Sequence, residues 1–350
     1  MSRSLADDLP ERIESVDELE DLLSTPSEPA IEALRTLDGD LLLLGVGGKI
    51  GPTLARMAVR ANEAAGRSRT IYGVARFSRP GLEERLRGWG IETVRCDLLD
   101  RESVARLPRA PNILWLAGRK FGTSHDAAAT WAMNVIAPAF VTDAFRGART
   151  VAFSTGNVYP LVPIESGGSR EEDELAPDGE YGRSALGRER VFEYASVAYG
   201  SPTAILRLNY AVEMRYGVLV DIACRVRDGE TIDLSMGHVN VIWQADANAA
   251  ALAAFQHARS PARTMNLAGP EILRVRDVAN RFGELLGRAP RLEGEESPDA
   301  LLNNGARGRE LWGPPRVGAE RIIEWIADWI ARGQPLHGLP THFEERSGAF

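Results

Sequence analysis

Three glycines follow an apolar run at a spacing that would let a phosphate approach the backbone. Residues Leu41–Leu44 are four consecutive leucines, and Gly45, Gly48 and Gly51 come next, just before a segment of helical composition at 52–58. A glycine-rich turn between a buried strand and a helix N-terminus binds pyrophosphate, because free N–H groups and the helix dipole face the anion. Since both the strand and the helix can be read from the sequence, the spacing predicts dinucleotide binding. The cofactor contacts predicted in this loop are Gly45, Gly48, Lys49, Ile50 and Gly51.

The loop needs a strand before it and a helix after it, and the same alternation continues to residue 208. Further strands are predicted near 70–75, 91–96, 112–116, 150–153 and 203–208. Helices are predicted near 52–65, after Pro80, near 126–146 and near 180–199. This alternation predicts an α/β fold, a Rossmann-type doubly wound parallel sheet with helices on both faces.

Ligands of such sheets lie beyond the carboxyl ends of the strands. Besides the glycine loop, the residues expected on this rim are Arg76, Asp97, Ala117–Lys120 and Thr155. Beyond residue 209 the pattern changes to loops, short strands and helices near 217–228, 246–258, 275–287 and 319–331. In the last helix, Trp325 and Trp329 share one face, so we expect them to pack in the core.

The composition is that of a soluble globular protein, with 44% apolar and 26% charged residues among 350. Two distant cysteines and five scattered histidines oppose a disulfide scaffold and a metal site. No apolar run approaches the ~20 residues of a membrane span, and the N-terminus shows no signal region. These features predict a cytoplasmic protein.

The charge is concentrated at the N-terminus. Residues 1–40 carry twelve acidic residues and three arginines, whereas the net charge of the whole chain is −8. The remainder is therefore near neutral, which opposes a nucleic-acid or anionic-membrane partner. We expect residues 1–38 to be a mobile or loosely packed helical extension, in the simplest case a solvated tail.

The basic residues are almost all arginine. The chain has 39 arginines and two lysines, Lys49 and Lys120. A coding bias toward arginine explains the imbalance, and it makes the two lysines candidates for tasks that arginine cannot perform.

Two further motifs lie downstream of the glycine loop. Phe153-Ser154-Thr155-Gly156-Asn157-Val158-Tyr159 ends the fifth strand, and Tyr181-Gly182-Arg183-Ser184-Ala185 begins the following helix. Together with Asp97-Leu98, Asn134-Val135 and Leu311–Pro315, these motifs make residues 41–332 resemble the extended short-chain dehydrogenase/reductase superfamily. The resemblance is closest to its NAD(P)-dependent epimerase/dehydratase branch, which includes UDP-glucose 4-epimerase and dTDP-glucose 4,6-dehydratase. The motifs together are specific for the superfamily, but none identifies a substrate.

The resemblance implies roles for several residues. Tyr181 matches the tyrosine that exchanges a proton while hydride moves to or from nicotinamide, and Thr155 matches the residue that hydrogen-bonds the reacting oxygen. Asn134 is implied as a structural helper, and Asp97, Leu98, Ala117 and Gly118 as cofactor contacts. A tyrosine base at neutral pH needs a nearby positive charge. The competing interpretations are a Tyr181 packed at the lobe interface and a Thr155 that caps backbone.

The chain departs from the family pattern four residues after the tyrosine. The resemblance implies a lysine there, which would lower the tyrosine pKa and hold the nicotinamide ribose, but the residue is Ala185. Arg183 points away on a helix. Lys120 and Arg188, which is ~10 Å along the helix axis from Tyr181, could compensate. The third alternative is no local replacement, with part of the charge supplied by the nicotinamide itself.

The end of the second strand predicts the cofactor. Arg76 stands there with Arg79 three residues on and no acid between them, and Lys49 adds charge nearby. An arginine at this position meets the 2′-phosphate of NADP, so NADP is favoured over NAD. The alternative is that Arg76 stacks on the adenine of NAD.

A substrate pocket is expected from residues 119–125, 156–159, 209–217 and 236–243. The candidate contacts are Arg119, Asn157, Asn209, Arg215 and His238. Arg119, Lys120 and Arg215 would favour an anionic substrate such as a sugar acid or a phosphorylated sugar. The alternative is that the arginines are ordinary surface residues and that His238 is a polar residue of a surface loop.

The length, the charge distribution and the change of pattern near residue 209 also predict a domain organisation. Residues 1–38 form the acidic extension, 39–208 an NAD(P)-binding Rossmann domain, 209–334 a smaller α/β substrate lobe interleaved with it, and 335–350 a tail. A homodimer is expected through the helices at 126–146 and 181–199.

The resulting hypothesis is an NAD(P)-dependent epimerase/dehydratase or oxidoreductase that transfers hydride to or from a hydroxyl-bearing, sugar-like molecule. Gly156-Asn157 stands where dehydratases have an acidic pair, which favours epimerisation or simple redox over elimination. Ala185 leaves open a different class, a catalytically weakened NAD(P)-binding sensor or scaffold.

Overall fold

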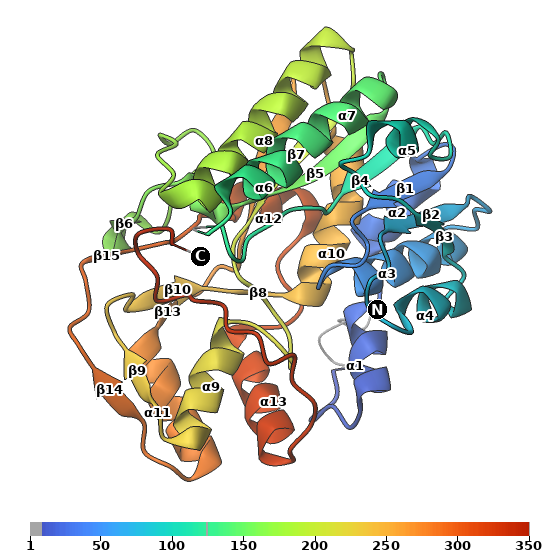
Figure 1. Cartoon of the computed structure of the whole chain (residues 1–350). Helices are drawn as coiled ribbons and strands as arrows, with labels where there is room; N and C mark the ends of the chain where they lie inside the picture. The colour runs from blue at the N-terminus through green and yellow to red at the C-terminus, as the bar shows by residue number, and fades with distance from the viewer. Residues whose placement is uncertain (1–8, 124, 350) are drawn as a thin grey trace.

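A seven-stranded parallel sheet forms the centre of the computed structural model, which describes residues 9–123 and 125–349. The strand order is β12-β7-β5-β4-β1-β2-β3 (Figure 1). The strands are β1 (Leu41–Leu44), β2 (Ile71–Ala75), β3 (Glu92–Arg95), β4 (Asn112–Trp115), β5 (Arg149–Thr155), β7 (Thr203–Leu208) and β12 (Arg263–Leu267). The predicted doubly wound α/β fold is confirmed.

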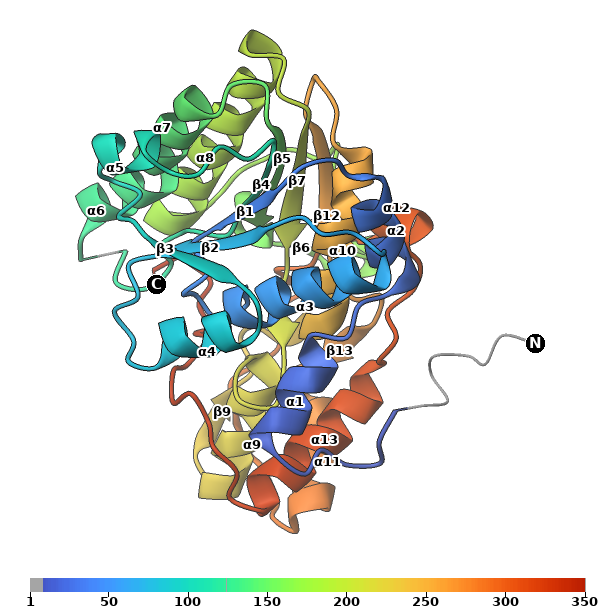
Figure 2. The ribbon, with the colours of Figure 1, turned by 90° about the vertical axis from the view of Figure 1, so that its right-hand side faces the viewer.

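Helices cover both faces of this sheet (Figure 2). On one face lie α2 (Glu28–Thr36), α3 (Gly51–Ala64), α4 (Leu82–Gly88) and α10 (Gln244–Ala253). On the other lie α5 (Arg101–Ala105), α6 (Ala127–Trp131), α7 (Ala137–Ala144) and α8 (Gly179–Ala198). Alternate leucines of β1 point to opposite faces, because Leu41 and Leu43 join the first core and Leu42 and Leu44 the second.

The strand register aligns the carboxyl ends that carry the site. Leu44 of β1 pairs with Val74 of β2 and with Trp115 of β4. The loops that follow these three strands therefore begin side by side.

The last strand of the sheet comes from the C-terminal half of the chain. β12 pairs in parallel with β7, from Arg263 opposite Ala204 to Leu267 opposite Leu208. Its sequence, Arg-Thr-Met-Asn-Leu, has no continuous apolar run, so the sequence pattern does not reveal it. The central sheet thus extends beyond residues 39–208.

A second, smaller part of the molecule lies below the sheet in Figure 1. It contains α9 (Val218–Asp228), α11 (Val275–Leu286) and α13 (Ala319–Ala331), with the paired short strands β9 (Thr231–Asp233) and β14 (Arg291–Glu293), and β10 (His238–Asn240) and β13 (Ile272–Arg274). Trp325 and Trp329 of α13 are buried, which confirms their predicted place in the core. The remaining short elements are β6 (Val162–Pro163), β8 (Ala211–Val212), β11 (Ile242–Trp243), α12 (Ala306–Trp312) and β15 (Asp299–Ala300).

The expectation of a loosely packed N-terminal extension is wrong for residues 9–38. α1 (Val16–Leu23) and α2 pack against α3 and α10, and Leu19, Leu23 and Leu34 are completely buried. Most acidic side chains lie on the outer face of an amphipathic segment, and its inner face joins the main core. Glu20 is the exception, because it is buried and pairs with Arg85 and Arg215. Residues 1–8, also part of that expectation, lie outside the described residues.

The C-terminal segment after α13 returns to the upper part of the molecule (Figure 1). Phe343 is fully buried, and Thr341 is nearly so. The backbone of Gly348 packs against Gly179 at the start of α8, so close that a Cβ on Gly179 would lie 2.1 Å from the Gly348 carbonyl oxygen. Among the described helices, none has the length and apolar character needed to cross a bilayer.

Candidate active site

The glycine loop has the geometry of a phosphate cradle. Gly45 has φ +92°, and a Cβ there would lie 2.6 Å from the backbone nitrogen of Ala117. A Cβ on Gly51 would lie 2.2 Å from the carbonyl oxygen of Val46, so this glycine allows the helix to pack against the turn. Gly48, between them, has only the carbonyl oxygen of Gly45 within 4 Å of such a Cβ, at 3.6 Å. The backbone at Gly48 is therefore open to a ligand.

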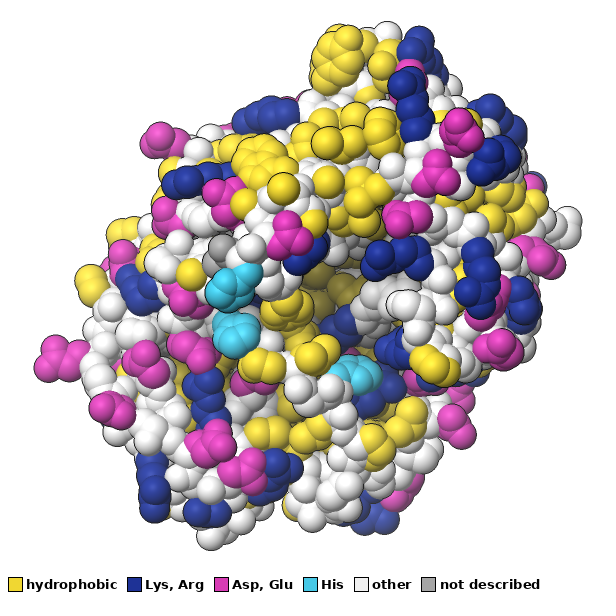
Figure 3. Space-filling view, viewed as in Figure 1, with side chains coloured by type: hydrophobic (Ala, Val, Ile, Leu, Met, Phe, Trp, Pro, Cys, Tyr) yellow, Lys and Arg dark blue, Asp and Glu magenta, His cyan; other side chains and the backbone are white. Residues whose placement is uncertain are grey.

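Two adjoining cavities share lining residues of this loop. The space-filling view shows the molecule hollowed between its upper and lower parts (Figure 3). We call the cavity of about 590 Å³ that opens toward β2 and β3 the outer cavity, and the cavity of about 290 Å³ that opens toward α8 the inner cavity. Gly45, Gly48, Gly118 and Lys120 line both. A dinucleotide spanning the loop would occupy both halves of this groove.

The outer cavity collects the residues that end β2, β3 and β4. The predicted contacts among its lining residues are Arg76, Asp97, Leu98, Ala117, Gly118 and Arg119. The Asp97 carboxylate accepts a hydrogen bond from the Leu99 N–H, and Arg119 forms an ion pair with Asp126.

The inner cavity brings Thr155 and Tyr181 together. Its lining residues that the sequence predicted as site residues are Gly45, Gly48, Lys49, Ile50, Gly51, Gly118, Lys120, Thr155, Asn157, Tyr181 and Asn209. Thr155 ends β5, and its Oγ1 lies 3.1 Å from Asn157 Oδ1 and accepts a hydrogen bond from the Asn157 N–H. The hydroxyl can act as a donor toward a ligand or toward Asn157, but not toward both at once.

A buried ion pair fixes α8 against the strand that carries Thr155. The Arg207 guanidinium on β7 donates to both carboxylate oxygens of Glu189 on α8, at 2.7 to 3.3 Å. Glu189 also accepts a hydrogen bond from Ser154, the residue before Thr155, and Arg207 donates to the Tyr159 hydroxyl. Burial raises the pKa of Tyr159 to about 12, so this phenol stays protonated. The network ties Tyr181, two turns earlier on α8, to the end of β5.

Arg188 occupies the inner cavity beside Tyr181. It lies seven residues after Tyr181 on α8, and helical side chains lean toward the helix N-terminus. Its Nη1 donates to the Ala117 carbonyl at 3.2 Å, and a Cβ on Gly118 would lie 2.7 Å from that nitrogen. Burial lowers the pKa of the Arg188 guanidinium, and the charge of a Tyr181 phenolate opposes this shift. Within the described part of the chain, Arg188 Nε has no hydrogen-bond partner.

Ala185 does not line the inner cavity. Its methyl group is fully buried in a small apolar cluster with Val158 and Tyr159. A lysine at this position would have to extend out of that cluster to reach Tyr181.

Asn134 connects the two loops of the site from a π-helical turn (Ala132–Ile136) between α6 and α7. Its Oδ1 accepts from the Arg119 N–H at 2.9 Å, and its Nδ2 donates to the Arg119 carbonyl and to Ser184 Oγ. The predicted long helix at 126–146 is therefore interrupted where Asn134 bonds the loop after β4 to α8.

A sequence model of the NAD dependent epimerase/dehydratase family matches residues 41–268. The chain belongs to this family. A comparison with curated proteins gives no significant match.

Solved structures share the fold. The UDP-glucose 4-epimerase of Thermus thermophilus, solved with NAD, has a TM-score of 0.69 and 21% identity, over 84% of this chain and 99% of that chain. DesIV, a dTDP-glucose 4,6-dehydratase from Streptomyces venezuelae solved with NAD and TYD, has a TM-score of 0.71 and 18% identity, over 84% of this chain and 97% of that chain.

The groove of this epimerase/dehydratase family member fits a nicotinamide dinucleotide. The open backbone at Gly48 and the N-terminus of α3 would hold the pyrophosphate, with the outer cavity for the adenosine half and the inner cavity for the nicotinamide half. Family membership and this fit support NAD(P) as the cofactor.

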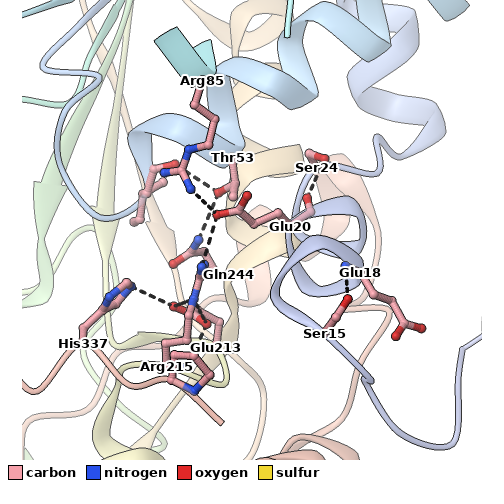
Figure 4. Close-up of polar contacts among 12 residues, drawn as sticks. Ser15, Glu18, Glu20, Ser24, Thr53, Arg85, Glu213, Arg215, Gln244 and His337 are labelled. Atoms are coloured by element: carbon pink, nitrogen blue, oxygen red, sulfur yellow. Dashed lines mark hydrogen bonds and ion pairs between the residues drawn. The ribbon is translucent and has the colours of Figure 1, made fainter. Parts of the chain in front are cut away.

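Three predicted site residues lie elsewhere than expected. The Lys49 side chain turns away from the outer cavity, because its ammonium group donates to the carbonyl oxygens of Ala211 and Tyr216. Arg215 forms ion pairs with Glu213 and Glu20 and lines neither cavity (Figure 4). His238 is placed in β10 opposite Arg274 and is also absent from both linings. The structure therefore does not bring Arg215 and His238 together with the other predicted substrate contacts, because an ion-pair network and a strand pairing hold these side chains outside both linings.

The inner cavity also includes residues that the sequence did not single out. Tyr210, Ala211 and Tyr216 come from the segment predicted to form the pocket, whereas no residue of 236–243 lines it. Thr341 comes from the C-terminal segment. No sequence motif marks Thr341, because its position depends on the return of the chain after α13. In the described ranges 9–123 and 125–349, no three His, Cys, Asp or Glu side chains are grouped as a metal site would need.

Proposed function

We propose that this protein is an NAD(P)-dependent epimerase or oxidoreductase that acts on a hydroxyl-bearing, sugar-like substrate. The observation that carries the proposal is that Thr155, Tyr181 and Arg188 line one cavity directly adjoining the glycine loop. Two solved structures with the same fold are a UDP-glucose 4-epimerase and a dTDP-glucose 4,6-dehydratase, and this similarity supports a sugar-containing substrate.

A nicotinamide held in the inner cavity would supply the hydride acceptor or donor for the substrate carbon. In this mechanism Tyr181 is the general acid–base: its phenolate accepts the proton of the substrate hydroxyl, and the resulting phenol returns the proton in the reverse step. Thr155 Oγ1 donates a hydrogen bond to the same substrate oxygen and holds it in place. Asn134 fixes the loop after β4 relative to α8, so that these groups keep their positions.

Arg188 supplies the positive charge that the resemblance assigns to a lysine at position 185. The Arg188 guanidinium lies within the cavity, and it interacts electrostatically with Tyr181. The unpartnered Nε of Arg188 leaves a donor for a ligand hydroxyl in the nicotinamide half of the groove. Lys120 lines the same cavity as Arg188, and the electrostatic contact between Arg188 and Tyr181 supports the role proposed for Arg188.

Epimerisation or simple redox is favoured over elimination. Elimination needs an acid and a base besides the tyrosine. The two residues that follow Thr155 are Gly156 and Asn157, and neither has an acidic side chain. Among the described lining residues of the inner cavity, none is Asp or Glu.

The test uses freshly purified protein. Mass spectrometry of the released nucleotide is expected to show NAD(H) or NADP(H), and sugars and sugar nucleotides are then screened by nicotinamide absorbance and by product stereochemistry. Tyr181→Phe is expected to reduce turnover about 10²- to 10⁴-fold. Tyr194→Phe is the matched control, because Tyr194 lies on the same helix but is 67% exposed. Equal activity of both variants and the native protein would contradict the role of Tyr181.

We further propose NADP as the preferred cofactor. Arg76 and Ser78 line the outer cavity, and the nearby acid Glu83 is paired with Arg87 and Arg95. Arg76→Asp is expected to weaken NADP binding and to improve NAD binding, each by about tenfold or more. Calorimetric titration measures both affinities, and an unchanged NADP affinity would favour stacking of Arg76 on adenine.

A second candidate is an NAD(P)-binding sensor or scaffold. The observation that favours it is the burial of Ala185 among apolar groups, which excludes an ammonium group at that point of the helix. Tight nucleotide binding without turnover on any sugar of the panel would favour this function over the enzyme.

A homodimer through α7 and α8 remains our proposal for the assembly. Apolar side chains gather over α6, α7 and α8 in Figure 3, and Ile136, Tyr194 and Val197 are between 47% and 67% exposed. Light scattering is expected to give twice the 38.2 kDa mass of the chain. A monomer at micromolar concentration would refute the proposal.

A further inference from the structure

Two half-buried tyrosines, Tyr210 and Tyr216, line the inner cavity together with Tyr181. Within residues 9–123 and 125–349, the hydroxyl groups of Tyr210 and Tyr216 have no hydrogen-bond partner. A polar group that is shielded from bulk water and has no partner in the protein is expected to bond to a ligand or to an ordered water. The wall of the inner cavity therefore carries two unused phenol hydroxyls.

The backbone of Tyr210 adopts a conformation that is costly for a bulky residue. Its φ is +42°, and the only other described non-glycine residues with positive φ are Phe77 and His342. Phe77 lines the outer cavity, and His342 follows Thr341 of the inner cavity, so all three lie at the groove. Such strain costs of order 1–3 kcal/mol, and it clusters at functional sites, where the surrounding structure enforces it.

Backbone hydrogen bonds on both sides hold Tyr210 in this conformation. The Asn209 N–H donates to the Leu267 carbonyl at 3.0 Å, and the Tyr210 carbonyl accepts from the Ile242 N–H at 3.2 Å. The next residue, Ala211, pairs with Ile242 between β8 and β11. These contacts fix Tyr210 two residues after the end of β7, at the inner cavity.

Tyr216 is held by its backbone and by its ring. Its N–H and its carbonyl form a pair of hydrogen bonds with Glu213, at 3.2 and 3.1 Å. The Lys49 ammonium group donates to the Tyr216 carbonyl and lies 4.1 Å from the centre of its ring. This cation–π contact stabilises the position of the ring and does not use its hydroxyl.

The surroundings of the two phenols keep them neutral. Burial raises the pKa of both, and a nearby negative charge adds to the shift, that of Glu344 for Tyr210 and that of Asp221 for Tyr216. Both carboxylates bond to other groups of the protein and to neither phenol. A neutral phenol can donate one hydrogen bond and accept another, which matches the hydroxyl groups of a sugar.

We propose that Tyr210 and Tyr216 determine specificity by hydrogen-bonding hydroxyl groups of the sugar-like substrate. This inference rests on the proposed function and assigns substrate contacts within it. Tyr181 interacts electrostatically with both phenols, so a hydroxyl-bearing ring bound to them would lie beside the general acid–base. The nicotinamide ribose carries hydroxyl groups of the same kind, and the experiment separates these two sources.

The test measures sugar binding by protein saturated with NAD⁺ or NADP⁺. The probes are UDP-glucose, dTDP-glucose and D-glucose, each titrated by calorimetry. At least one probe is expected to bind the native protein, and to bind Tyr210→Phe and Tyr216→Phe about 3- to 10-fold more weakly, because each variant lacks one hydrogen bond. Tyr72→Phe is the matched control and should bind as the native protein does, because Tyr72 is half-buried in β2 but lines neither cavity.

Nucleotide affinity and melting temperature are measured on the same proteins. Both are expected to keep their native values, because phenylalanine preserves the ring and its packing. For a probe that is turned over, KM should rise more than kcat falls, whereas a general loss of structure would lower kcat and the melting temperature. Each variant tests one hydroxyl group, so either of them suffices if the other does not fold.

Native affinity for the sugar probes in either variant would overturn the assignment of that tyrosine. Binding of no probe would overturn both assignments, while nucleotide binding still supported the proposed function. A loss of nucleotide affinity as large as the loss of sugar affinity would assign the hydroxyls to the cofactor ribose and would also overturn the inference. Absence of nucleotide binding by the native protein would instead overturn the proposed function.

Discussion

Replacement of the half-buried Lys49 should change how the stability of the protein depends on pH. Burial lowers the pKa of Lys49 from 10.5 to about 7 in the folded protein. In the unfolded chain the amine keeps its ordinary pKa, so between these values the unfolded state binds more protons than the folded state. The free energy of unfolding therefore rises with pH over this interval and is lowest, on account of this group, below about pH 7.

The size of the effect follows from the shift. One pKa unit corresponds to 1.36 kcal/mol, so the contribution of Lys49 should rise by about 2 kcal/mol between about pH 7 and about pH 9. With an unfolding entropy of ~2.1 cal/mol/K per residue, the 350 residues give ~0.7 kcal/mol/K. The melting temperature of the native protein should therefore rise by ~3 °C relative to Lys49→Met over these two pH units.

Differential scanning calorimetry of the two proteins, at several pH values and constant ionic strength, measures this difference. Methionine keeps most of the side-chain volume, and Glu213, the carboxylate that faces Lys49, remains paired with Arg215. Lys120→Met is the matched variant, because its pKa of about 8 predicts the same sign with a rise that begins about one unit higher. Melting temperatures that stay parallel for the native and Lys49→Met proteins would show that Lys49 titrates normally and would refute the reasoning.

Three further predictions concern the N-terminal segment and the site. Leu19→Ala should lower the free energy of unfolding by about 2–5 kcal/mol in urea titrations, because Leu19 is fully buried. The control Leu285→Ala, at a leucine that is 38% exposed, should change this free energy far less. Equal effects of the two substitutions would contradict the packing of α1. Glu20→Gln should cost about 1–3 kcal/mol in the same assay, since the buried carboxylate pairs with Arg85 and Arg215, and native-like stability would contradict a structural role of these pairs. Gly118→Ala should displace the Arg188 guanidinium and reduce kcat while the melting temperature falls by a few degrees at most; unchanged kcat would contradict the role of Arg188.

Local signals in the sequence predicted the elements that form the central sheet. Leu41–Leu44 are buried on both faces and form a central strand, so an uninterrupted apolar run was a sufficient signal. β12 carries polar residues at three of its five positions and lies at the sheet edge, where only its pairing with β7, some 60 residues earlier, defines it. The N-terminal segment was misjudged because its net charge was weighed and the spacing of Leu19 and Leu23 on one helical face was not.

The candidate site also has a part that local sequence signals predicted and a part that depends on contacts between distant segments. Its rim, at Gly45–Gly51, Asp97 and Thr155, follows from strand ends and was predicted together. The side chains that face the ligand from outside the sheet depend on contacts between distant segments. Thr341 reaches the inner cavity from the end of the chain, and Arg215 is held by Glu20 of the N-terminal segment, so neither position could be derived from local spacing.

Arg188 shows why spacing along a helix is an incomplete guide to which side chains line one cavity. Seven residues correspond to ~10 Å of axial rise, which argues against contact with Tyr181 when only Cα positions are compared. An extended arginine that leans toward the helix N-terminus covers much of this distance. The absence of a side chain at Gly118 leaves room for its Nη1, while Ala185 packs into apolar surroundings where an ammonium group would be costly. The positive charge beside Tyr181 therefore depends jointly on Arg188 and Gly118, and Gly118→Ala and Arg188→Met should reduce kcat non-additively when combined.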